Sequence, residues 1–355
     1  MATSTKGDNV SDMEAVKKLQ DAYKKLKESL HKVIIGQEKV LDELLTCVFS
    51  RGHAVIVGVP GLAKTLLVRA LAQCLGLSFN RIQFTPDLMP SDITGTEVID
   101  QDKASGERFL RFIKGPIFSN IILADEINRT PPKTQAALLE AMQELQVTVG
   151  GKKYPLETPF FVLSTQNPIE QEGTYPLPEA QLDRFMFMIN IGYPQASEEF
   201  EIMKLTSSSF DIKLEGVLSG HDIVKLQEII RRVPVSDHIL KYAAAVTRQT
   251  RVNQPGIPQF VKDWVQWGAG PRASMYLVTT AKAHAVLNGR FFVNVEDIKA
   301  VAHPVLRHRI IVNFSAEAEG VNSDKIIDKL LEVTPENETE LEKIHHLPKV
   351  VEVKK

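Results

Sequence analysis

The glycine-rich segment Gly58–Thr65 (GVPGLAKT) is the feature that most restricts the folds open to this chain. It follows an apolar run, Ala54–Val57, and precedes a stretch whose apolar residues recur at helical spacing. A loop between a strand and a helix N-terminus presents backbone N–H groups to an anion, and such loops bind nucleotide phosphates. Lys64 would add a positive charge near the β- and γ-phosphates, and the Thr65 hydroxyl would bind Mg²⁺. The segment therefore predicts a phosphate-binding loop for ATP.

This loop departs from its usual pattern at one position. Ala63 stands where a glycine usually precedes the lysine. A methyl group makes positive φ angles costly, so we expect the backbone at Ala63 to avoid a positive φ. Between Gly58 and this alanine lie the other residues expected to surround the phosphates: Val59, Pro60, Gly61 and Leu62.

Two adjacent carboxylates stand at the end of another apolar run. Asp125 and Glu126 follow Asn120–Ala124, which has the pattern of a buried strand. Downstream of a phosphate loop, such a pair suits ATP hydrolysis, with Asp125 holding Mg²⁺ and Glu126 accepting a proton from the attacking water. A further apolar run, Phe160–Thr165, leads to Asn167, which would orient that water or contact the γ-phosphate. Taken alone, an asparagine before a proline is more often a turn residue.

Strand-like runs alternate with helical segments in the first half of the chain. Alternation of this kind predicts a parallel sheet with helices on its faces and the ligand at the carboxyl ends of the strands. After Pro194 the strand pattern stops and long helical stretches follow, which predicts a smaller helical domain. The expected division is an amphipathic helix in 1–31, the α/β domain in 32–194, the helical domain in 195–334 and a flexible tail in 335–355. The N-terminal helix offers fewer than three heptads, so we expect it to pack on its own domain rather than in a coiled coil.

Composition excludes several classes of protein. With 355 residues, 43% of them hydrophobic and 24% charged, the chain suits a two-domain globular protein rather than a disordered or fibrous one. A net charge of -2 indicates no overall attraction to nucleic acid or anionic membranes. Cys47 and Cys74 lie in apolar stretches without metal-ligand spacing, and they predict buried thiols in a reducing compartment. No signal peptide or membrane-spanning segment is visible, so we expect a cytoplasmic protein.

Four stretches of the chain carry a longer pattern: Gly58–Thr65, Asp125–Met142, Thr165–Pro168 and Glu172–Phe185. Together they resemble the MoxR group of AAA+ ATPases, over a region from about Val33 to Pro335. The resemblance implies a P-loop NTPase fold of class α/β, with a parallel five-stranded sheet as the AAA+ core and a smaller all-α lid domain. Ala63 looks like this family's own variant of the loop.

The resemblance also implies roles for individual residues. Asn167 matches the sensor 1 asparagine. Arg184 matches the arginine finger, which would enter a neighbouring subunit's site and stabilise charge on the transferring phosphoryl group. Arg272 matches the sensor 2 arginine and would close over the phosphates from the lid. Arg129 is a further candidate for a contact across subunits. The segment that borders adenine is matched by Ile35, Gly36 and Gln37.

Two segments resemble insertions of this branch of the superfamily. They span residues 88–114 and 146–156, and the second reads as a β-hairpin that turns at Gly150-Gly151. In a ring these insertions would face the central pore. Their basic residues could touch nucleic acid or acidic protein, although a charge cluster of this kind is more often a solvated face. These residues are Arg108, Arg111, Lys114, Lys152 and Lys153.

The remaining histidines and tryptophans have ordinary explanations. His303, His308 and the pair His345-His346 lack companion ligands at metal spacing. Trp264 and Trp267 fall at helical spacing, so we expect them to pack beneath the lid rather than to stack on bases.

The leading functional hypothesis is a ring of subunits, expected to be hexameric, that uses ATP and Mg²⁺ to remodel or mature other proteins. An arginine finger makes a neighbouring subunit necessary. MoxR-like ATPases often act as chaperones with a protein that carries a von Willebrand factor A domain, which would be a separate chain here. One alternative is a nucleic-acid motor or a metal-chelatase-type motor subunit, because such proteins share the insertions. Another is an assembly platform that binds ATP without useful turnover.

Overall fold

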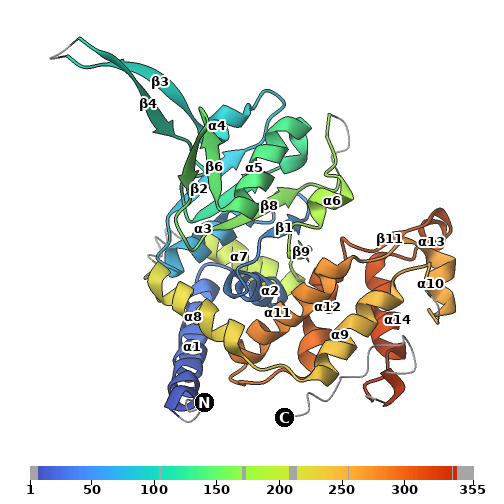
Figure 1. Ribbon diagram of the computed structural model, residues 1–355. Helices are drawn as coiled ribbons and strands as arrows, with labels where there is room; N and C mark the ends of the chain where they lie inside the picture. Colours follow the sequence, from blue (N-terminus) through green and yellow to red (C-terminus); the bar gives the residue numbers. More distant parts are fainter. Residues whose placement is uncertain are drawn as a thin grey trace, which may run out of the picture.

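A five-stranded parallel sheet forms the centre of the first domain in a computed structural model of the chain, which describes residues 7–103, 106–169, 173–207, 214–254, 256–337 and 339–341 (Figure 1). All of its strand pairs are parallel. The predicted strands and their direction are therefore confirmed. In the order β2-β5-β8-β1-β9 across the sheet, the strands are β2 (Phe79–Gln83), β5 (Ile121–Asp125), β8 (Phe161–Gln166), β1 (Ala54–Val57) and β9 (Phe187–Asn190).

The apolar strand sequences follow from burial of the sheet on both faces. Along β5, Ile121 and Leu123 belong to one hydrophobic cluster, whereas Ile122 and Ala124 belong to the other. Helices α2 (Glu38–Phe49) and α3 (Lys64–Cys74) contribute to the first cluster, and α5 (Pro132–Glu144) contributes to the second. A strand covered on both faces needs apolar side chains, which is why β5 shows no alternation of polar and apolar residues, whereas β2 at the edge of the sheet exposes Asn80, Arg81 and Gln83.

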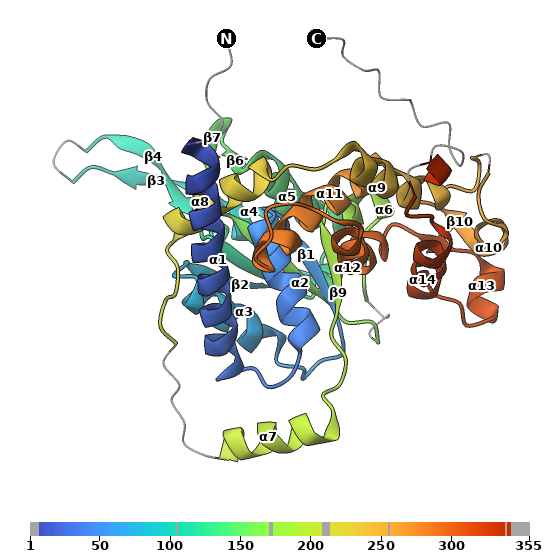
Figure 2. The same ribbon diagram turned by 90° about the horizontal axis from the view of Figure 1, so that it is seen from below.

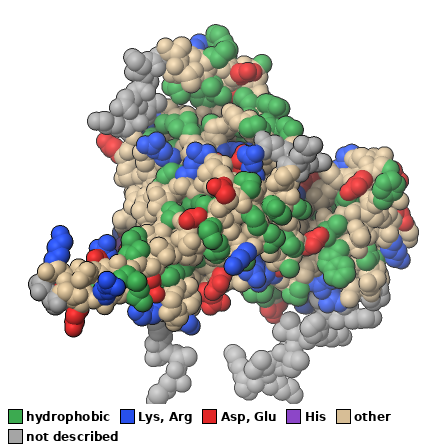
Figure 3. All heavy atoms as spheres, turned by 90° about the horizontal axis from the view of Figure 1, so that it is seen from above, with side chains coloured by type: hydrophobic (Ala, Val, Ile, Leu, Met, Phe, Trp, Pro, Cys, Tyr) green, Lys and Arg blue, Asp and Glu red, His purple; other side chains and the backbone are tan. Residues whose placement is uncertain are grey.

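Both predicted insertions form antiparallel hairpins. The segment 88–114 contains α4 (Pro90–Thr94), β3 (Gly95–Gln101) and β4 (Arg108–Lys114), and its hairpin projects from the body as an arm (Figures 1 and 3). The second hairpin pairs β6 (Gln146–Val149) with β7 (Lys152–Pro155). Its turn at Gly150-Gly151 has φ values of 56° and 78°, as the sequence predicts. Phe112 of the arm stacks on Tyr154 of the second hairpin with ring centroids 4.0 Å apart.

The second domain is mainly helical, but the expectation that strands stop after Pro194 is wrong. β10 (Val265–Trp267) pairs with β11 (Ile311–Val312) in an antiparallel ladder. Strands of two or three residues are too short to show a periodic pattern, so the sequence carries no signal for them. The helices of this part of the chain are α7 (Ala196–Ser207), α8 (Gly220–Arg232), α9 (Asp237–Gln249), α10 (Gln259–Trp264), α11 (Pro271–Leu287), α12 (Val295–Leu306), α13 (Phe314–Ala318) and α14 (Ser323–Val333).

Helix α7 stands apart from the other helices (Figure 2). None of its residues is buried, and Phe200 and Met203 are each 55% exposed. It approaches the core at Gly36, where an added Cβ atom would lie 2.3 Å from Oε1 of Glu198. The helix therefore presents apolar side chains that the described part of the chain leaves exposed.

The ends of the chain dock on both domains. Leu19, Leu26 and Leu30 of α1 (Gly7–His31) are fully buried, and the helix contacts α3, α8 and α11. It thus packs within the chain, as expected. The predicted tail begins with docked residues, because Leu341 is buried and Glu336 pairs with Lys299. Its remaining part, 342–355, lies outside the described residues.

The cysteines and histidines behave as packing residues. Cys47 and Cys74 are buried and free. His303 contacts Asp328, and within the described ranges no group of three or more His, Cys, Asp or Glu residues could hold a metal ion. His345-His346 lies beyond the described residues. Among the helices that the structure describes, none has both the length and the apolarity needed to cross a bilayer.

Candidate nucleotide-binding site

The glycine-rich loop joins the carboxyl end of β1 to the first turn of α3. Gly58 is packed so closely that an added Cβ atom would lie 2.7 Å from the carbonyl oxygen of Ile191. Gly61 has φ of 85°, a conformation that favours glycine. Lys64 Nζ donates a hydrogen bond of 2.5 Å to the carbonyl oxygen of Gly58, which folds the side chain back over the loop. Burial lowers the pKa of Lys64, while Asp125 and Glu126 act in the opposite direction. The lysine is therefore partly desolvated and faces two carboxylates.

Ala63 adopts the conformation that we expected it to avoid. Its φ and ψ of 54° and 25° lie in the left-handed region, immediately before α3 begins. The turn from the loop into the helix imposes this geometry whether or not the residue carries a methyl group. For an alanine the conformation costs roughly 1–2 kcal/mol, so the surrounding fold must hold it in place. The expectation of a negative φ at Ala63 was wrong because the geometry of the loop outweighs the local strain of the methyl group.

Asp125 ends β5 and is held by residues from both neighbouring strands. Its Oδ2 accepts hydrogen bonds from Nε and Nη2 of Arg81 at 3.0 and 2.6 Å. The Thr165 hydroxyl of β8 donates to Oδ1 at 2.6 Å. The carboxylate is 9% exposed, so these contacts fix its direction. Arg81 and Thr165 were missed by the sequence reasoning, because they meet Asp125 only across the sheet.

Glu126 lies one residue beyond the strand, where the chain turns sharply. Its φ of 56° is left-handed, and its backbone N–H donates to the Thr165 hydroxyl at 2.8 Å. Its Oε2 accepts hydrogen bonds from Gln83 Nε2 and Arg129 Nη1, each at 3.0 Å. Arg129, the further candidate for an intersubunit contact, is thus paired with Glu126 in this chain. Thr165 bonds both acidic residues and sets their relative orientation.

Asn167 lies directly beside the start of the phosphate loop. The backbone N–H of Gly58 donates to the carbonyl oxygen of Gln166, the preceding residue, at 3.3 Å. Asn167 is 7% exposed, and its Oδ1 accepts a hydrogen bond of 3.1 Å from the backbone N–H of Ile169. This is the local turn that an asparagine before a proline favours. The same bond fixes the side chain, so the turn and the predicted phosphate contact are compatible.

The segment predicted to border adenine lies at the same edge of the sheet. Gly36 and Gln37 both have left-handed φ angles, of 66° and 58°. Gln37 Nε2 donates a hydrogen bond of 3.1 Å to the carbonyl oxygen of Gly192, which follows β9. Ile35 is half-buried beside them. The carboxyl edge therefore gathers the segment around Ile35, the phosphate loop, the two acids and Asn167.

Arg184 lies at the opposite edge of the sheet. Phe187 pairs with Ala54 and Asn190 pairs with Val57, so β9 runs beside β1 in the same direction. The phosphate loop follows the end of β1, whereas Arg184 precedes the start of β9. The three residue steps from Ala54 to Val57 along β1 span about 10 Å. Arg184 lies three residues before Phe187, the residue of β9 that pairs with Ala54. This register places Arg184 before the start of β9, at the other end of the strands from the phosphate loop of its own chain.

Arg272 contacts the residue next to Arg184 at the amino edge of the sheet. Its Nη1 donates to Oδ2 of Asp183 at 2.8 Å, and Asp183 is the residue before Arg184. We expected Arg272 to close over the nucleotide from the lid of the subunit that binds it. The contact with Asp183 holds the start of α11 at the amino edge of the sheet, and closure of Arg272 over a nucleotide stays a prediction. Arg184 itself is half-buried and has no ion-pair partner in the described part of the chain.

Comparison with known proteins finds similar proteins among ATPases. Residues 53–187 match the family described as ATPase family associated with various cellular activities (AAA), and residues 259–330 match the AAA lid domain. The chain is 41% identical to Chaperone MoxR1 of Mycobacterium tuberculosis, over 90% of this chain and 84% of that protein. It is 42% identical to the uncharacterized protein YeaC of Bacillus subtilis, over 86% and 91% of the two chains. A crystal structure of a candidate ATPase from Cytophaga hutchinsonii superposes with a TM-score of 0.84 and 43% identity, over 92% of this chain and 98% of that one.

The chain belongs to the MoxR group of AAA+ ATPases. Its α/β core and its lid domain are those of this family, and nucleotide binding is a property of the family. The predicted boundary between residues 194 and 195 stays a prediction, because the lid match begins further along the chain.

One residue of the MoxR lid that the sequence reasoning missed organises the amino edge. Arg309 is 5% exposed and bonds Asp183 through Nε to Oδ1 at 2.7 Å and through Nη2 to the backbone oxygen at 2.8 Å. A further bond of 2.7 Å reaches the carbonyl oxygen of Phe185. Burial lowers the pKa of Arg309 and the carboxylate of Asp183 raises it. The backbone on both sides of Arg184 is thus clamped by the lid.

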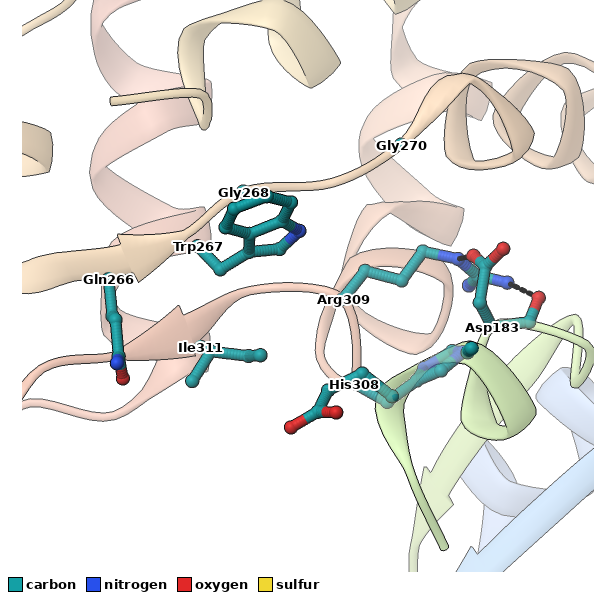
Figure 4. A pocket seen from close by; sticks show the side chains of 10 residues that line it. Asp183, Gln266, Trp267, Gly268, Gly270, His308, Arg309 and Ile311 are labelled. Atoms are coloured by element: carbon teal, nitrogen blue, oxygen red, sulfur yellow. Dashed lines mark hydrogen bonds and ion pairs between the residues drawn. The ribbon is translucent and has the colours of Figure 1, made fainter. Parts of the chain in front are cut away.

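A cavity of about 550 Å³ opens at this edge between the lid and the core (Figure 4). Asp183 lines it from the core, and Trp267 and His308 line it from the lid. Trp267 is 66% exposed, so the expectation that it packs beneath the lid was wrong, whereas Trp264 does pack against the core cluster. The difference arises because Trp264 ends α10 and Trp267 lies in β10, so helical spacing does not relate them. Burial and the neighbouring Arg309 hold the pKa of His308 well below its ordinary value.

Proposed function

We propose that this protein hydrolyses ATP at sites shared between neighbouring subunits of a ring. The carboxyl edge of one subunit would bind the nucleotide and activate water, and the amino edge of the next would supply Arg184 and Arg272. The observation that supports this is the register of β1 and β9, which places Arg184 at the other end of the strands from the loop of its own chain. An arginine in that position can stabilise transferring phosphate only in a neighbour's site.

Each residue at the carboxyl edge has a distinct part in the proposed reaction. Backbone N–H groups of the loop and Lys64 would bind the phosphates, and Asn167 would contact the γ-phosphate or orient the water. Glu126 would accept the proton from that water. The hydrogen bonds from Gln83 and Arg129 both reach Oε2, and the other carboxylate oxygen, Oε1, would accept the proton.

Thr65 and Asp125 fit a Mg²⁺ ion bound together with ATP. The ion takes oxygen ligands and is usually held by one or two protein groups plus phosphates and water, rather than by a cage of side chains. A carboxylate at the end of β5 and a hydroxyl at the start of α3 would form such a donor set, and within the described residues no group of three or more His, Cys, Asp or Glu could hold a metal ion. When bound, Mg²⁺ neutralises charge that develops on the phosphate oxygens.

The proposed biological role is remodelling or maturation of partner proteins by a hexameric ring in the cytoplasm, together with a separate protein that carries a von Willebrand factor A domain. One relative, from Mycobacterium tuberculosis, is named a chaperone. The nucleic-acid alternative has less support, since basic residues of the hairpins pair with acids: Arg111 contacts Asp100 at 3.2 Å and Lys152 contacts Glu97 at 3.8 Å.

Mixing two inactive variants tests the shared site. Arg184→Ala keeps the carboxyl edge intact, and Glu126→Gln keeps the amino edge intact. Neither protein alone should hydrolyse ATP, but mixed rings contain interfaces with both groups, so steady-state phosphate release should return. A mixture of Arg184→Ala with Lys64→Ala is a second pair that should recover activity. If no mixture recovers activity although size-exclusion chromatography shows mixed rings, the proposal of action in trans is wrong.

A further inference from the structure

A second cavity, of about 430 Å³, lies where the end of α2 meets the lid helices α8 and α11. Three basic side chains line it, one from each of these parts of the chain: Arg51, Arg231 and Lys282. No residue of the nucleotide site lines this cavity. It is therefore separate from the function proposed above.

Positive charge around this cavity exceeds the negative charge that faces it. Lys282 Nζ donates only to the backbone oxygen of Arg231, at 3.0 Å, and Arg231 has no ion-pair partner among the described residues. Burial and the Arg231 guanidinium lower the pKa of Lys282. The acid nearest to Arg51 is Glu228, at 3.8 Å, and α11 contains neither Asp nor Glu along its length. Two like charges meet here without a compensating carboxylate.

Two neutral polar residues of the lining are Ser50 and Gln227. Ser50 is 7% exposed, and its buried hydroxyl has no hydrogen-bond partner in the described part of the chain. Gln227 is fixed from both ends, since its Nε2 donates to the carbonyl oxygen of Val48 at 2.8 Å and its Oε1 accepts from Arg51 Nε at 3.0 Å. Gln227 thereby holds the Arg51 guanidinium against the end of α2.

We propose that this cavity binds a small phosphorylated anion. A phosphate group offers several charged acceptor oxygens, which match two guanidinium groups and an ammonium. The volume is that of sites for small molecules and is too small for a folded partner. The anion would bridge α2 of the core to α8 and α11 of the lid. Its binding should therefore stabilise the junction between the two domains.

Inorganic pyrophosphate is the probe for this site, and isothermal titration calorimetry is the measurement. All proteins carry Lys64→Ala, so that the phosphate loop contributes little to binding. In this background Lys282→Met should weaken pyrophosphate binding about ten-fold or more, because a charged hydrogen-bond donor is lost. Lys282→Arg should retain binding. The matched control is Lys225→Met, which removes an exposed charge from α8 outside the cavity.

Thermal unfolding tests whether damage to the fold, rather than loss of the Lys282 charge, weakens pyrophosphate binding. Without pyrophosphate, Lys282→Met should unfold at the same or a higher temperature than its parent, because it removes a half-buried charge beside Arg231. With pyrophosphate, the parent and Lys225→Met should be stabilised and Lys282→Met should not. Failure of pyrophosphate to bind the Lys64→Ala protein would overturn the proposal. Equal binding by the Lys282→Met protein would do the same.

Discussion

The carboxyl edge of the sheet holds a phosphate loop, two acids and a buried asparagine. The amino edge of the same sheet holds Arg184 and Arg272, far from the phosphate loop of their own chain. The carboxyl edge is held by bonds between neighbouring strands, such as Arg81 to Asp125. The amino edge is held by bonds between domains, such as Arg309 to Asp183. Movement of the lid would therefore disturb the amino edge first. This difference suits a site in which nucleotide binding and lid position are coupled across subunits.

Removal of the Arg184 guanidinium should have the largest effect on rate. Arginine fingers contribute about 10³ to 10⁵ to phosphoryl transfer in other nucleotide hydrolases. We expect Arg184→Ala to lose a comparable factor in steady-state ATP hydrolysis while nucleotide affinity stays close to that of the wild type. A fluorescent nucleotide titration measures the affinity. Unchanged turnover would show that the amino edge takes no part in catalysis.

Glu126→Gln changes the carboxyl edge instead. Loss of a general base costs about 10² to 10⁴ in rate. The variant should keep its affinity for ATP, because the amide preserves the shape of the side chain and the loop is untouched. Lys64→Ala is the contrasting variant at the same edge, since it should lose binding as well as turnover. Wild-type hydrolysis by Glu126→Gln in a single-turnover assay would exclude Glu126 as the base.

Asp183→Asn tests whether the lid clamp controls the amino edge. The substitution leaves the buried Arg309 guanidinium without its carboxylate, which should lower the free energy of unfolding by about 3 kcal/mol. It also releases Arg272, so hydrolysis should fall even where the protein remains folded. Chemical denaturation and ATPase assays separate these effects. Asp324→Asn is a control, because it breaks the Arg307 ion pair elsewhere in the lid. Equal losses of hydrolysis in both variants would contradict a specific role for Asp183.

The smallest expected effect concerns Ala63. Glycine tolerates the left-handed conformation found there, so Ala63→Gly should relieve strain, partly offset by greater freedom of the unfolded chain. The expected net stabilisation is about 1 kcal/mol, measured by thermal unfolding. Ala136→Gly in the ordinary helical part of α5 should destabilise by a similar amount. Loss of stability in Ala63→Gly would show that the methyl group makes packing contacts that outweigh the strain.

Much of the fold was predictable because its signals are local. The inner strands of the sheet, the helices that cover them and the hairpin turn at Gly150-Gly151 each follow from apolar runs, helical spacing or glycine content. The phosphate loop and the acidic pair were also visible, since consecutive residues carry their chemistry. Local reasoning was wrong at Ala63 and Trp267, where the requirements of a turn and of a three-residue strand override residue preference.

By itself, the sequence determined which residues could bind phosphate and activate water, because those groups depend on neighbours along the chain. Only the tertiary structure decided which of them meet. Arg81, Thr165 and Arg309 contact the acids from distant elements, and parallel register separates Arg184 from the phosphate loop by the length of a strand. Strand order and the docking of the lid are set by long-range packing, which leaves no local signature. For that reason the motifs of the sequence indicate the chemistry of the site, whereas only the folded structure indicates where the arginines lie.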